Sequence, residues 1–501
     1  MSEPYKQFSH GVIPTLEKLS QAVNQVGALN SDLDLPFSFA ITSKTTRFSY
    51  LFPDLQTADA LLPDVPEMRA SLIRLGDSMI ETVDNSANSS IPSAYTYLGQ
   101  FIDHDITLEA KSDSMVKLSD GDFRVLTPEE IIANITNGRT PGLDLDNLYY
   151  KPAPRNCSRM ALGFVSDDEN IPLLHKANDL PRQRRSIRPE DDRAALIGDK
   201  RDDENLIIAQ LHVAFLRAHN AIVDRGHTFQ EARRILRRHY QWIVVKDFLP
   251  RICDRWIVSE ILFGGNKVFR PNPDDLFMPF EFSVAAYRFG HSMVRGTYQY
   301  NSAFPRATLN ELFTQTALSG SLGTASVLPE KWIIEWKNFI DGGANRARPI
   351  DTSLSTALFH LRQFDNPLPI EARLPVRNLL RGYMLRLPTG QAVATALGLT
   401  VLRPEEIEAV AHSVSDAQLA AVRDGGFSRR TPLWYYILAE AAASTGRLGP
   451  VGSTIVAEVV IGLIRGSKDS ILREPSWKPT LGKTPGLFTL RDLLELGGVL
   501  N

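Results

Sequence analysis

Cysteine is almost absent from this chain of 501 residues, which contains only Cys157 and Cys253. Two cysteines are too few for a disulfide framework and for a zinc site built from thiolates. An excess of one charge is also lacking, because 55 basic and 58 acidic residues give a formal net charge of −3. This balance provides no electrostatic reason to bind nucleic acid or an anionic membrane. We therefore expect neither as a partner.

Long hydrophobic runs are missing as well. The N-terminal sequence MSEPYKQFSHGVIP has no apolar core of a secretory signal. The apolar stretch STIVAEVVIGLI at residues 453–464 is too short to span a bilayer and contains a glutamate. We predict a soluble protein without a transmembrane segment, either cytoplasmic or exported by a non-classical route. The oligomeric state stays open.

Helical periodicity is the dominant pattern. Residues 205–224 have apolar side chains at three- and four-residue spacing, and residues 233–261 continue in this style. Pro250 should kink or split that second helix. Strand-like alternation is scarce, so we predict a mainly α fold with an N-terminal arm, residues 1–90, packed on one large domain, residues 91–501. Further helical patterns occur at residues 284–294, 374–387, 431–443 and 455–463.

The stretch YLGQFIDHD at residues 97–105 places one histidine between two aspartates. Ser93 follows a proline and is a candidate cap for a helix that contains the stretch. Successive side chains on a helix point about 100° apart. Asp103, His104 and Asp105 should therefore face three directions, which makes three separate roles more plausible than one shared metal ion.

The longer string LGQFIDHDIT resembles the distal-histidine signature of the animal-type haem peroxidases, in the peroxidase–cyclooxygenase superfamily that includes myeloperoxidase. Three more motifs of that family follow in order: GDKRDDENLIIAQLHVAFLRAHN at residues 198–220, YRFGHS at 287–292 and RNLLR at 377–381. With so few cysteines, the chain looks like a compact bacterial member. The resemblance implies a large multi-helix haem peroxidase domain that binds haem b and uses hydrogen peroxide.

Peroxide cleavage needs a group that moves a proton from one oxygen to the other, and neutral imidazole suits this role. The resemblance assigns it to His104. A fixed cation should stabilise the negative charge that develops on the departing oxygen. Arg201 matches that cation. Gln100, one helical turn before His104, resembles the family's pocket glutamine.

The resemblance makes His291 the proximal iron ligand. Its other ring nitrogen should donate a hydrogen bond to a supporting acceptor, and Asn378 matches that partner. Arg381 looks like the arginine that binds a haem propionate. Arg288 matches a family arginine near the haem rim.

Two carboxylates match positions that form ester bonds to haem methyl groups in mammalian members, namely Asp103 and Glu204. Whether these esters form here stays open. The family's third link uses a methionine directly after the glutamate. Asn205 stands there in this chain, which excludes a sulfonium link.

Asp105 matches a calcium ligand of the family, whose other ligands come from a separate loop. That loop corresponds here to TPGLDLDNLY at residues 140–149. All of its candidate donors are oxygen atoms, as calcium requires. The resemblance gives as further ligands Thr140, the carbonyl of Gly142, Asp144 and Asp146.

The implied function is a peroxidase that oxidises small organic donors, halides or thiocyanate. The alternative is a fatty-acid dioxygenase or cyclooxygenase-like enzyme, in which a tyrosine typically lies three residues before the proximal histidine. Arg288 occupies that position here, and Tyr287 lies four residues before His291. If the segment is an α-helix, Tyr287 faces elsewhere, which argues against oxygenase chemistry. A non-catalytic member should have lost His104, Arg201 or His291, and all three are present.

Two more histidines, His212 and His219, lie seven residues apart on the helix predicted at residues 205–224. Their apolar neighbours favour packing in the core over metal binding.

Overall fold

The computed structural model describes residues 46–82, 88–109, 123–149, 155–156, 158–166, 177–188, 192–316, 327–361, 370–444 and 446–500. Residues 1–45 and 83–87 of the predicted N-terminal arm lie outside this part of the chain, as does Cys157. Over the described residues the fold is mainly helical, as predicted.

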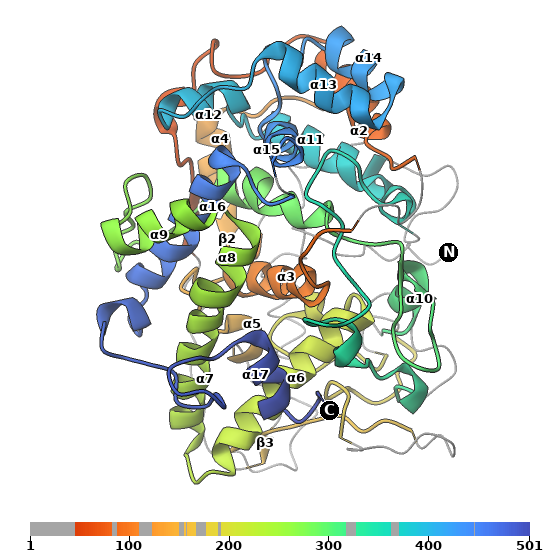
Figure 1. Ribbon diagram of the computed structural model, residues 1–501, viewed down its shortest axis with the longest axis vertical. Helices are drawn as coiled ribbons and strands as arrows, with labels where there is room; N and C mark the ends of the chain where they lie inside the picture. Colours follow the sequence, from red (N-terminus) through yellow and green to blue (C-terminus); the bar gives the residue numbers. More distant parts are fainter. Residues whose placement is uncertain are drawn as a thin grey trace.

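Helices form nearly all of the regular structure (Figure 1). The longest, α6, lies beside α3 and α7, and α16 contacts α9 and α15. The α-helices are α2 (Met68–Ser78), α3 (Ala94–Ile106), α4 (Pro128–Asn134), α5 (Asp146–Tyr149), α6 (Leu206–Val223), α7 (Phe229–Ile243), α8 (Leu249–Ile252), α9 (Arg255–Gly264), α10 (Leu309–Thr314), α11 (Leu374–Met384), α12 (Gly390–Ala396), α13 (Pro404–Val414), α14 (Asp416–Asp424), α15 (Leu433–Ala442), α16 (Pro450–Gly466) and α17 (Leu490–Leu496).

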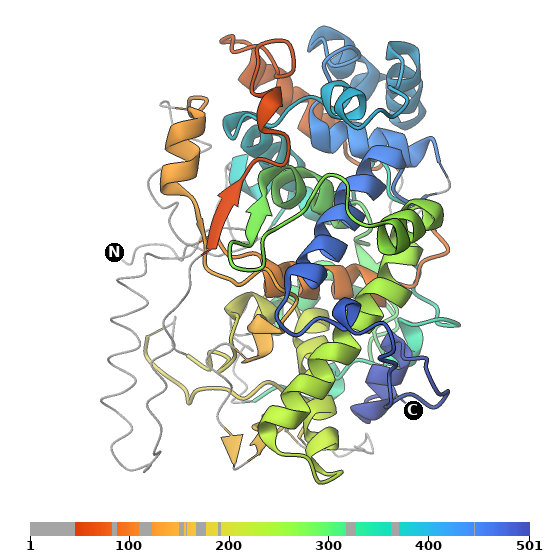
Figure 2. The ribbon, with the colours of Figure 1, turned by 90° about the vertical axis from the view of Figure 1, so that its left-hand side faces the viewer.

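The strands are short and sit at the margin of the helical body (Figure 2). In the three-stranded sheet, β1 pairs antiparallel with β2 and parallel with β5, so that Arg47 lies opposite Phe277. The other two sheets are two-stranded hairpins. The strands are β1 (Thr46–Ser49), β2 (Thr136–Asn137), β3 (Arg155–Asn156), β4 (Arg159–Met160), β5 (Phe277–Pro279), β6 (Thr297–Tyr298) and β7 (Ala307–Thr308).

Helix α6 forms the centre of the core. Its start is set by Asn205, whose side chain accepts a hydrogen bond from the backbone N–H of Ile208 at 3.0 Å. Among the described helices, α6 is the one long and apolar enough to cross a bilayer, but 83% of it is buried inside the protein. A helix that is apolar all round fits the interior of a large domain.

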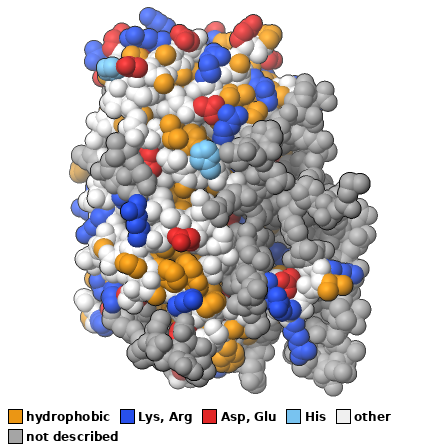
Figure 3. All heavy atoms as spheres, turned by 90° about the vertical axis from the view of Figure 1, so that its right-hand side faces the viewer, with side chains coloured by type: hydrophobic (Ala, Val, Ile, Leu, Met, Phe, Trp, Pro, Cys, Tyr) orange, Lys and Arg blue, Asp and Glu red, His pale blue; other side chains and the backbone are white. Residues whose placement is uncertain are grey.

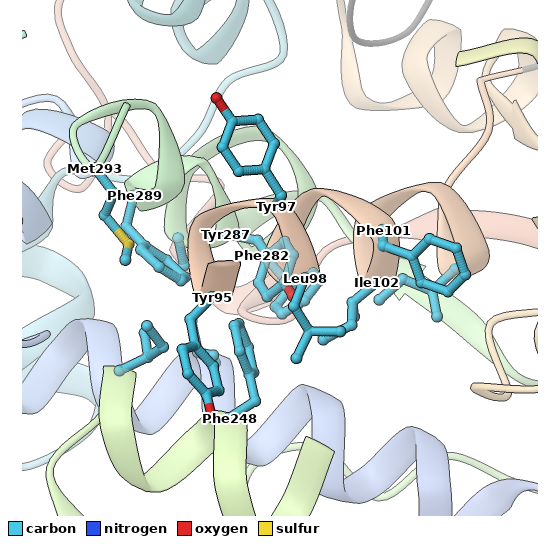
Figure 4. Packing of buried hydrophobic residues seen from close by; sticks show 14 of the residues in the cluster. Tyr95, Tyr97, Leu98, Phe101, Ile102, Phe248, Phe282, Tyr287, Phe289 and Met293 are labelled. Atoms are coloured by element: carbon cyan, nitrogen blue, oxygen red, sulfur yellow. The ribbon is translucent and has the colours of Figure 1, made fainter. Parts of the chain in front are cut away.

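Helix α3 carries the Asp-His-Asp stretch and crosses the middle of the molecule (Figure 1). It begins one residue after Ser93, as predicted, but the Ser93 side chain makes no capping hydrogen bond. Figure 4 shows Tyr95 and Tyr97 projecting from opposite sides of α3, with Phe248 close to Tyr95. This packing on several sides holds the orientation of the helix.

The second long helix predicted from the sequence is divided near Pro250. Pro250 lies in the first turn of α8, where its missing N–H is tolerated. The π-helical turn η3 (Val244–Phe248) precedes α8, which ends at its C-cap Cys253 before α9 begins.

The helix predicted at residues 284–294 is not an α-helix. A π-helical turn, η4 (Glu281–Ala285), passes into the 3₁₀-helix η5 (Ala286–His291). Irregular helical turns of this kind often mark functional segments. Nearby, α11 packs so closely on α2 that a Cβ at Gly76 would lie 2.7 Å from the side chain of Val376.

Basic, acidic and hydrophobic side chains are interspersed over the described part of the face in Figure 3. This distribution agrees with the small net charge of the chain.

Candidate active site

A large cavity lies between α3 and the η4–η5 segment. It encloses about 1350 Å³, counting its open mouth, and its walls are mostly apolar and aromatic. An apolar wall with a few polar groups is typical of a site for an organic ligand. Seven residues predicted from the sequence line it: Gln100, Asp103, Arg201, Glu204, Arg288, His291 and Arg381.

His291 ends η5, and its Nδ1 lies 2.8 Å from the amide nitrogen of Asn378 on α11. Arg288 donates from Nη1 to the Asn378 side-chain oxygen at 2.6 Å. With the oxygen held by Arg288, the amide presents its N–H to the imidazole. Asn378 therefore contacts His291, the residue that it was predicted to support. An imidazole that binds iron through Nε2 carries its hydrogen on Nδ1, so it would donate to Asn378 once the amide oxygen faces it.

Arg201 is fixed by carboxylate and carbonyl oxygens. Asp199 accepts hydrogen bonds from Arg201 Nη2 at 2.7 Å and from Arg139 Nη2 at 2.6 Å. Arg201 Nη2 also donates to the carbonyl of Thr107 at 2.5 Å, and its Nη1 lies 3.8 Å from Asp103 Oδ2. Burial lowers the pKa of Arg201, but the charge and hydrogen bonds of Asp199 outweigh burial and raise it. Arg201 is a permanent cation of the cavity wall.

Gln100 and Glu204 form a second polar contact at the cavity. The Gln100 amide donates to Glu204 Oε1, and its oxygen lies 3.4 Å from the Asn205 side-chain nitrogen. Burial raises the pKa of Glu204 to about 7, despite the opposing charges of His104 and Arg201. At neutral pH this carboxyl therefore exists in both protonation states.

His104 is fully buried beside the cavity, and it is not among the described residues that line it. Its Nδ1 lies 2.6 Å from Asp202 Oδ1. Burial and the charge of Arg201 lower the pKa of His104, but the hydrogen bond and charge of Asp202 outweigh both and raise it. Because α3 packs on η5, the helix of His104 and the turn of His291 are neighbours.

The predicted calcium ligands lie on another side of α3, where Asp105 Oδ1 accepts a hydrogen bond from the backbone N–H of Asp146 at 2.5 Å. Burial and the charges of Asp146 and Asp144 raise the pKa of Asp105 well above its usual value. The loop residues Leu143 and Leu145 both have positive φ, at 50° and 59°, a strained conformation for leucine. Such strain is common where a loop is shaped for a ligand.

The side chains of the loop have separate hydrogen-bond partners. Asp144 Oδ1 accepts a hydrogen bond from Ser467 Oγ at 3.2 Å, and Thr140 N–H donates to Asp146 Oδ2 at 3.0 Å. No group of three acidic, histidine or cysteine side chains in the described part of the chain is arranged to hold a metal ion. All of the candidate donors are oxygen atoms, which are the ligands that calcium prefers.

Tyr287 departs from the expectation that it faces away from His291, because it lines the same cavity. Its ring stacks on Phe282 with centroids 4.7 Å apart (Figure 4). The expectation assumed α-helical geometry, whereas η4 and η5 have π and 3₁₀ geometry. The position of Tyr287 in the sequence therefore no longer counts against oxygenase chemistry.

Four site residues were not predicted. Asp199 lies in a recognised motif, but nothing in its spacing shows that it binds Arg139 and Arg201. Asp202 sits at a variable motif position, and Glu109 forms a buried ion pair with Arg381. Apart from the contact between Asp199 and Arg201, these contacts join residues that are far apart in the sequence, so no local pattern reveals them. The four residues are Glu109, Arg139, Asp199 and Asp202.

The cavity fits a haem group by several observations. It combines an apolar wall with an imidazole, His291, and two guanidinium groups, Arg288 and Arg381. Burial lowers the pKa of each arginine to about 10, so both remain charged at neutral pH and can bind carboxylates. The donor set therefore suits an iron porphyrin with propionate groups.

Comparison with known proteins agrees with this donor set. The family model "Animal haem peroxidase" matches residues 133–467, more than half of the chain. A peroxidase-like protein of Margaritifera margaritifera is 35% identical over 123 residues, which are 22% of this chain and 16% of that protein. Lactoperoxidase of Mesocricetus auratus is 30% identical over 179 residues, 31% of this chain and 24% of that protein. The matched segments are thus a minor part of both relatives.

Solved structures share the fold over most of the chain. Peroxidase A from Dictyostelium discoideum has a TM-score of 0.59 at 15% identity and covers 88% of this chain and 90% of its own. A fatty acid alpha-dioxygenase from Arabidopsis thaliana has a TM-score of 0.55 at 10% identity and covers 87% and 75%. The family model matches more than half of the chain, including three of the four sequence motifs, and the chain therefore belongs to the animal haem peroxidase family.

Proposed function

We propose that this chain is a haem peroxidase that reduces hydrogen peroxide and oxidises small organic donors, halides or thiocyanate. The observation that carries the proposal is the convergence of a fixed cation, Arg201, and an imidazole, His291, on one large apolar cavity. Family membership supports the same reaction.

In this proposal His291 binds the iron, Arg381 binds a propionate, and Arg288 lies near the haem rim. Asp103 and Glu204 both lie at the cavity wall, which supports the proposal that they are the residues that would form ester links to haem. When bound, haem supplies the two electrons that peroxide takes up and recovers them from the donor.

The chain's own residues handle the proton and the charge. His104 takes a proton from one peroxide oxygen and returns it to the other, which leaves as water. Arg201 stabilises the negative charge on the departing oxygen. Gln100, held by Glu204, orients a water molecule or halide in the cavity.

Calcium belongs to the same proposal. An ion bound by Asp105 of α3 and by Thr140, Gly142, Asp144 and Asp146 of the loop would neutralise carboxylates that now raise each other's pKa. It would also tie α3, and hence His104, to the loop.

The test is to load purified protein with haemin and measure the Soret spectrum and the peroxide-dependent oxidation of guaiacol and bromide. His104→Ala should retain haem and lose peroxide reactivity by about 10²- to 10⁴-fold. The matched control is His412→Ala, an exposed histidine on α13, which should react like the wild type. A haemin-loaded protein that oxidises no donor with peroxide would refute the proposal.

A fatty-acid oxygenase is the second candidate, because Tyr287 lines the cavity with His291. In that case linoleate should drive oxygen consumption without added peroxide. Tyr287→Phe should abolish it, whereas Tyr383→Phe, outside the large cavity, should not. Oxygen uptake with linoleate and no peroxide-driven guaiacol oxidation would make this the primary function.

A further inference from the structure

Asp202 lies at the centre of a fully buried hydrogen-bond cluster. Its Oδ1 is 2.6 Å from His104 Nδ1, and its Oδ2 is 2.7 Å from His212 Nδ1. The amide of Asn147 donates to the same Oδ2 at 3.1 Å. The four residues come from the 3₁₀-helix η2 (Lys200–Asp203) and from α3, α6 and α5. One carboxylate therefore joins three separate helices behind the cavity.

The chemistry of a carboxylate fixes the hydrogens in this cluster. An ionised aspartate only accepts hydrogen bonds, so each Nδ1 that faces it must carry the hydrogen. Burial raises the pKa of Asp202, but hydrogen bonds from His104 and His212 outweigh burial and lower it, which keeps the carboxyl ionised. A neutral imidazole that carries its hydrogen on Nδ1 has Nε2 as its proton acceptor.

We propose that Asp202 is the positioning residue of the peroxide reaction, holding His104 as the Nδ1–H tautomer so that Nε2 is the nitrogen that takes the proton from peroxide. The inference rests on the proposed peroxidase function. Asp202 itself touches neither peroxide nor haem. It lies at a variable position of the G-D-x-R-x-x-E motif, so the family resemblance assigns it no role.

His212 and Asn147 are the supports of Asp202. They bind the oxygen that His104 does not use, which stops the carboxylate from rotating away. His212 was expected to be a core-packing histidine. Its ring does pack against Phe101 at 6.0 Å, but its Nδ1 completes the cluster.

The substitution Asp202→Asn separates positioning from simple filling of space. An asparagine has nearly the same shape, but it offers one acceptor oxygen and one N–H donor group. One of the two histidines must then present an unprotonated Nδ1 and move its hydrogen to Nε2. The matched control is Asp203→Asn, because Asp203 is equally buried but pairs with Arg182 at 2.6 Å.

The first measurement uses the haem-free protein. Long-range ¹H–¹⁵N spectra of ¹⁵N-histidine-labelled protein at alkaline pH distinguish Nδ1–H from Nε2–H tautomers, and His104→Gln and His212→Gln assign the signals. We expect the Nδ1–H form for both histidines in the wild type and in Asp203→Asn, and an Nε2–H signal for one of them in Asp202→Asn. A wild-type His104 that carries its hydrogen on Nε2 would overturn the inference, and this outcome does not require Asp202→Asn to fold.

The second measurement uses haemin-loaded protein mixed rapidly with hydrogen peroxide. Asp202→Asn should slow the Soret change about 10- to 100-fold at unchanged haem content, by analogy with the loss seen when the hydrogen-bond partner of a metal-bound histidine is changed. Asp203→Asn should react as fast as the wild type once folded. An Asp202→Asn protein that reacts at the wild-type rate would also overturn the inference. A wild type that does not react with peroxide would instead refute the proposed function, and the tautomer measurement would still stand.

Discussion

The carboxylate of Glu109 and the guanidinium of Arg381 form an ion pair at the cavity wall, with both side chains at least nine-tenths buried. The sequence assigned Arg381 to a haem propionate and assigned Glu109 nothing. A propionate bound there would compete with Glu109 for the same cation. Glu109 thus supplies an anion at the place where the carboxylate of the ligand is expected.

The first prediction concerns this competition. Glu109→Gln should tighten haemin binding about tenfold, because one charge-assisted hydrogen bond is no longer displaced. The same change should destabilise the haem-free protein by roughly 3 kcal/mol, because it leaves a buried arginine without its counter-ion. Haemin titration and thermal unfolding without haemin measure the two effects.

The control for that experiment is Glu130→Gln, an exposed carboxylate paired with Arg124. It should change neither the affinity for haemin nor the stability appreciably. If Glu109→Gln instead weakens haemin binding, Glu109 supports the haem site and does not compete for it.

The sequence predicted what depends on local pattern and on motif order. Helix α6 appears where apolar periodicity predicted it, and α3 begins where the Pro92–Ser93 signal predicted a helix start. The three side chains of the Asp-His-Asp stretch do face different partners. Asp103 lines the cavity, His104 binds Asp202, and Asp105 binds the backbone of Asp146. Each of these directions follows from the 100° step of a helix.

What the sequence could not predict depends on backbone hydrogen-bond register and on contacts across the fold. Apolar spacing near Tyr287 fits an α-helix, but the chain adopts π and 3₁₀ turns there, and Tyr287 lines the cavity. Asp202 stands 98 positions from His104, so no local signal joins the two. The contact between Arg288 and the Asn378 side-chain oxygen was also missed, because the two residues are 90 positions apart.

The second prediction concerns calcium. At a calcium concentration 100-fold above its Kd, the wild type should gain about 2.7 kcal/mol of stability, lost again on chelation. Asp146→Asn should remove most of this gain, because it deletes one charged ligand. Thermal unfolding with calcium, with magnesium and with EGTA measures the effect, and the exposed Asp416→Asn serves as control. An equal response to calcium in Asp146→Asn would contradict the predicted ligand set.

The third prediction concerns the proximal side. Asn378→Asp offers carboxylate oxygens to both Arg288 and His291 Nδ1. An anionic acceptor strengthens the electron donation of an iron-bound imidazole and stabilises ferric iron. The reduction potential of the haemin-loaded variant should therefore fall below that of the wild type, and Asn378→Leu should not lower it. Spectroelectrochemical titration gives the potentials, and an unchanged potential in Asn378→Asp would show that His291 does not use this partner.

The fourth prediction concerns stability against pH. Glu281 is fully buried, and its carboxylate accepts hydrogen bonds from the backbone N–H groups of Leu51 at 2.7 Å and Phe52 at 3.1 Å. Burial raises its pKa to about 7, against the opposing effect of these hydrogen bonds. A carboxyl with a raised pKa in the folded state stabilises the fold while protonated and loses that contribution as pH rises through 7.

The difference in unfolding free energy between the wild type and Glu281→Gln should therefore become smaller as pH rises. Glu281→Gln should be less stable than the wild type in acid. The glutamine NH₂ group would point at one of the two backbone N–H groups, and two donors cannot form a hydrogen bond with each other. Between about pH 5 and pH 8.5 the wild type should lose roughly 3 kcal/mol relative to the variant, as a shift of this size implies. Urea unfolding at several pH values provides the comparison.

Glu231→Gln is the control. Hydrogen bonds from Thr228 lower the pKa of that exposed carboxyl, so the effect of the substitution should appear only at lower pH. A stability difference between wild type and Glu281→Gln that stays constant over the whole range would mean that Glu281 is already ionised in acid.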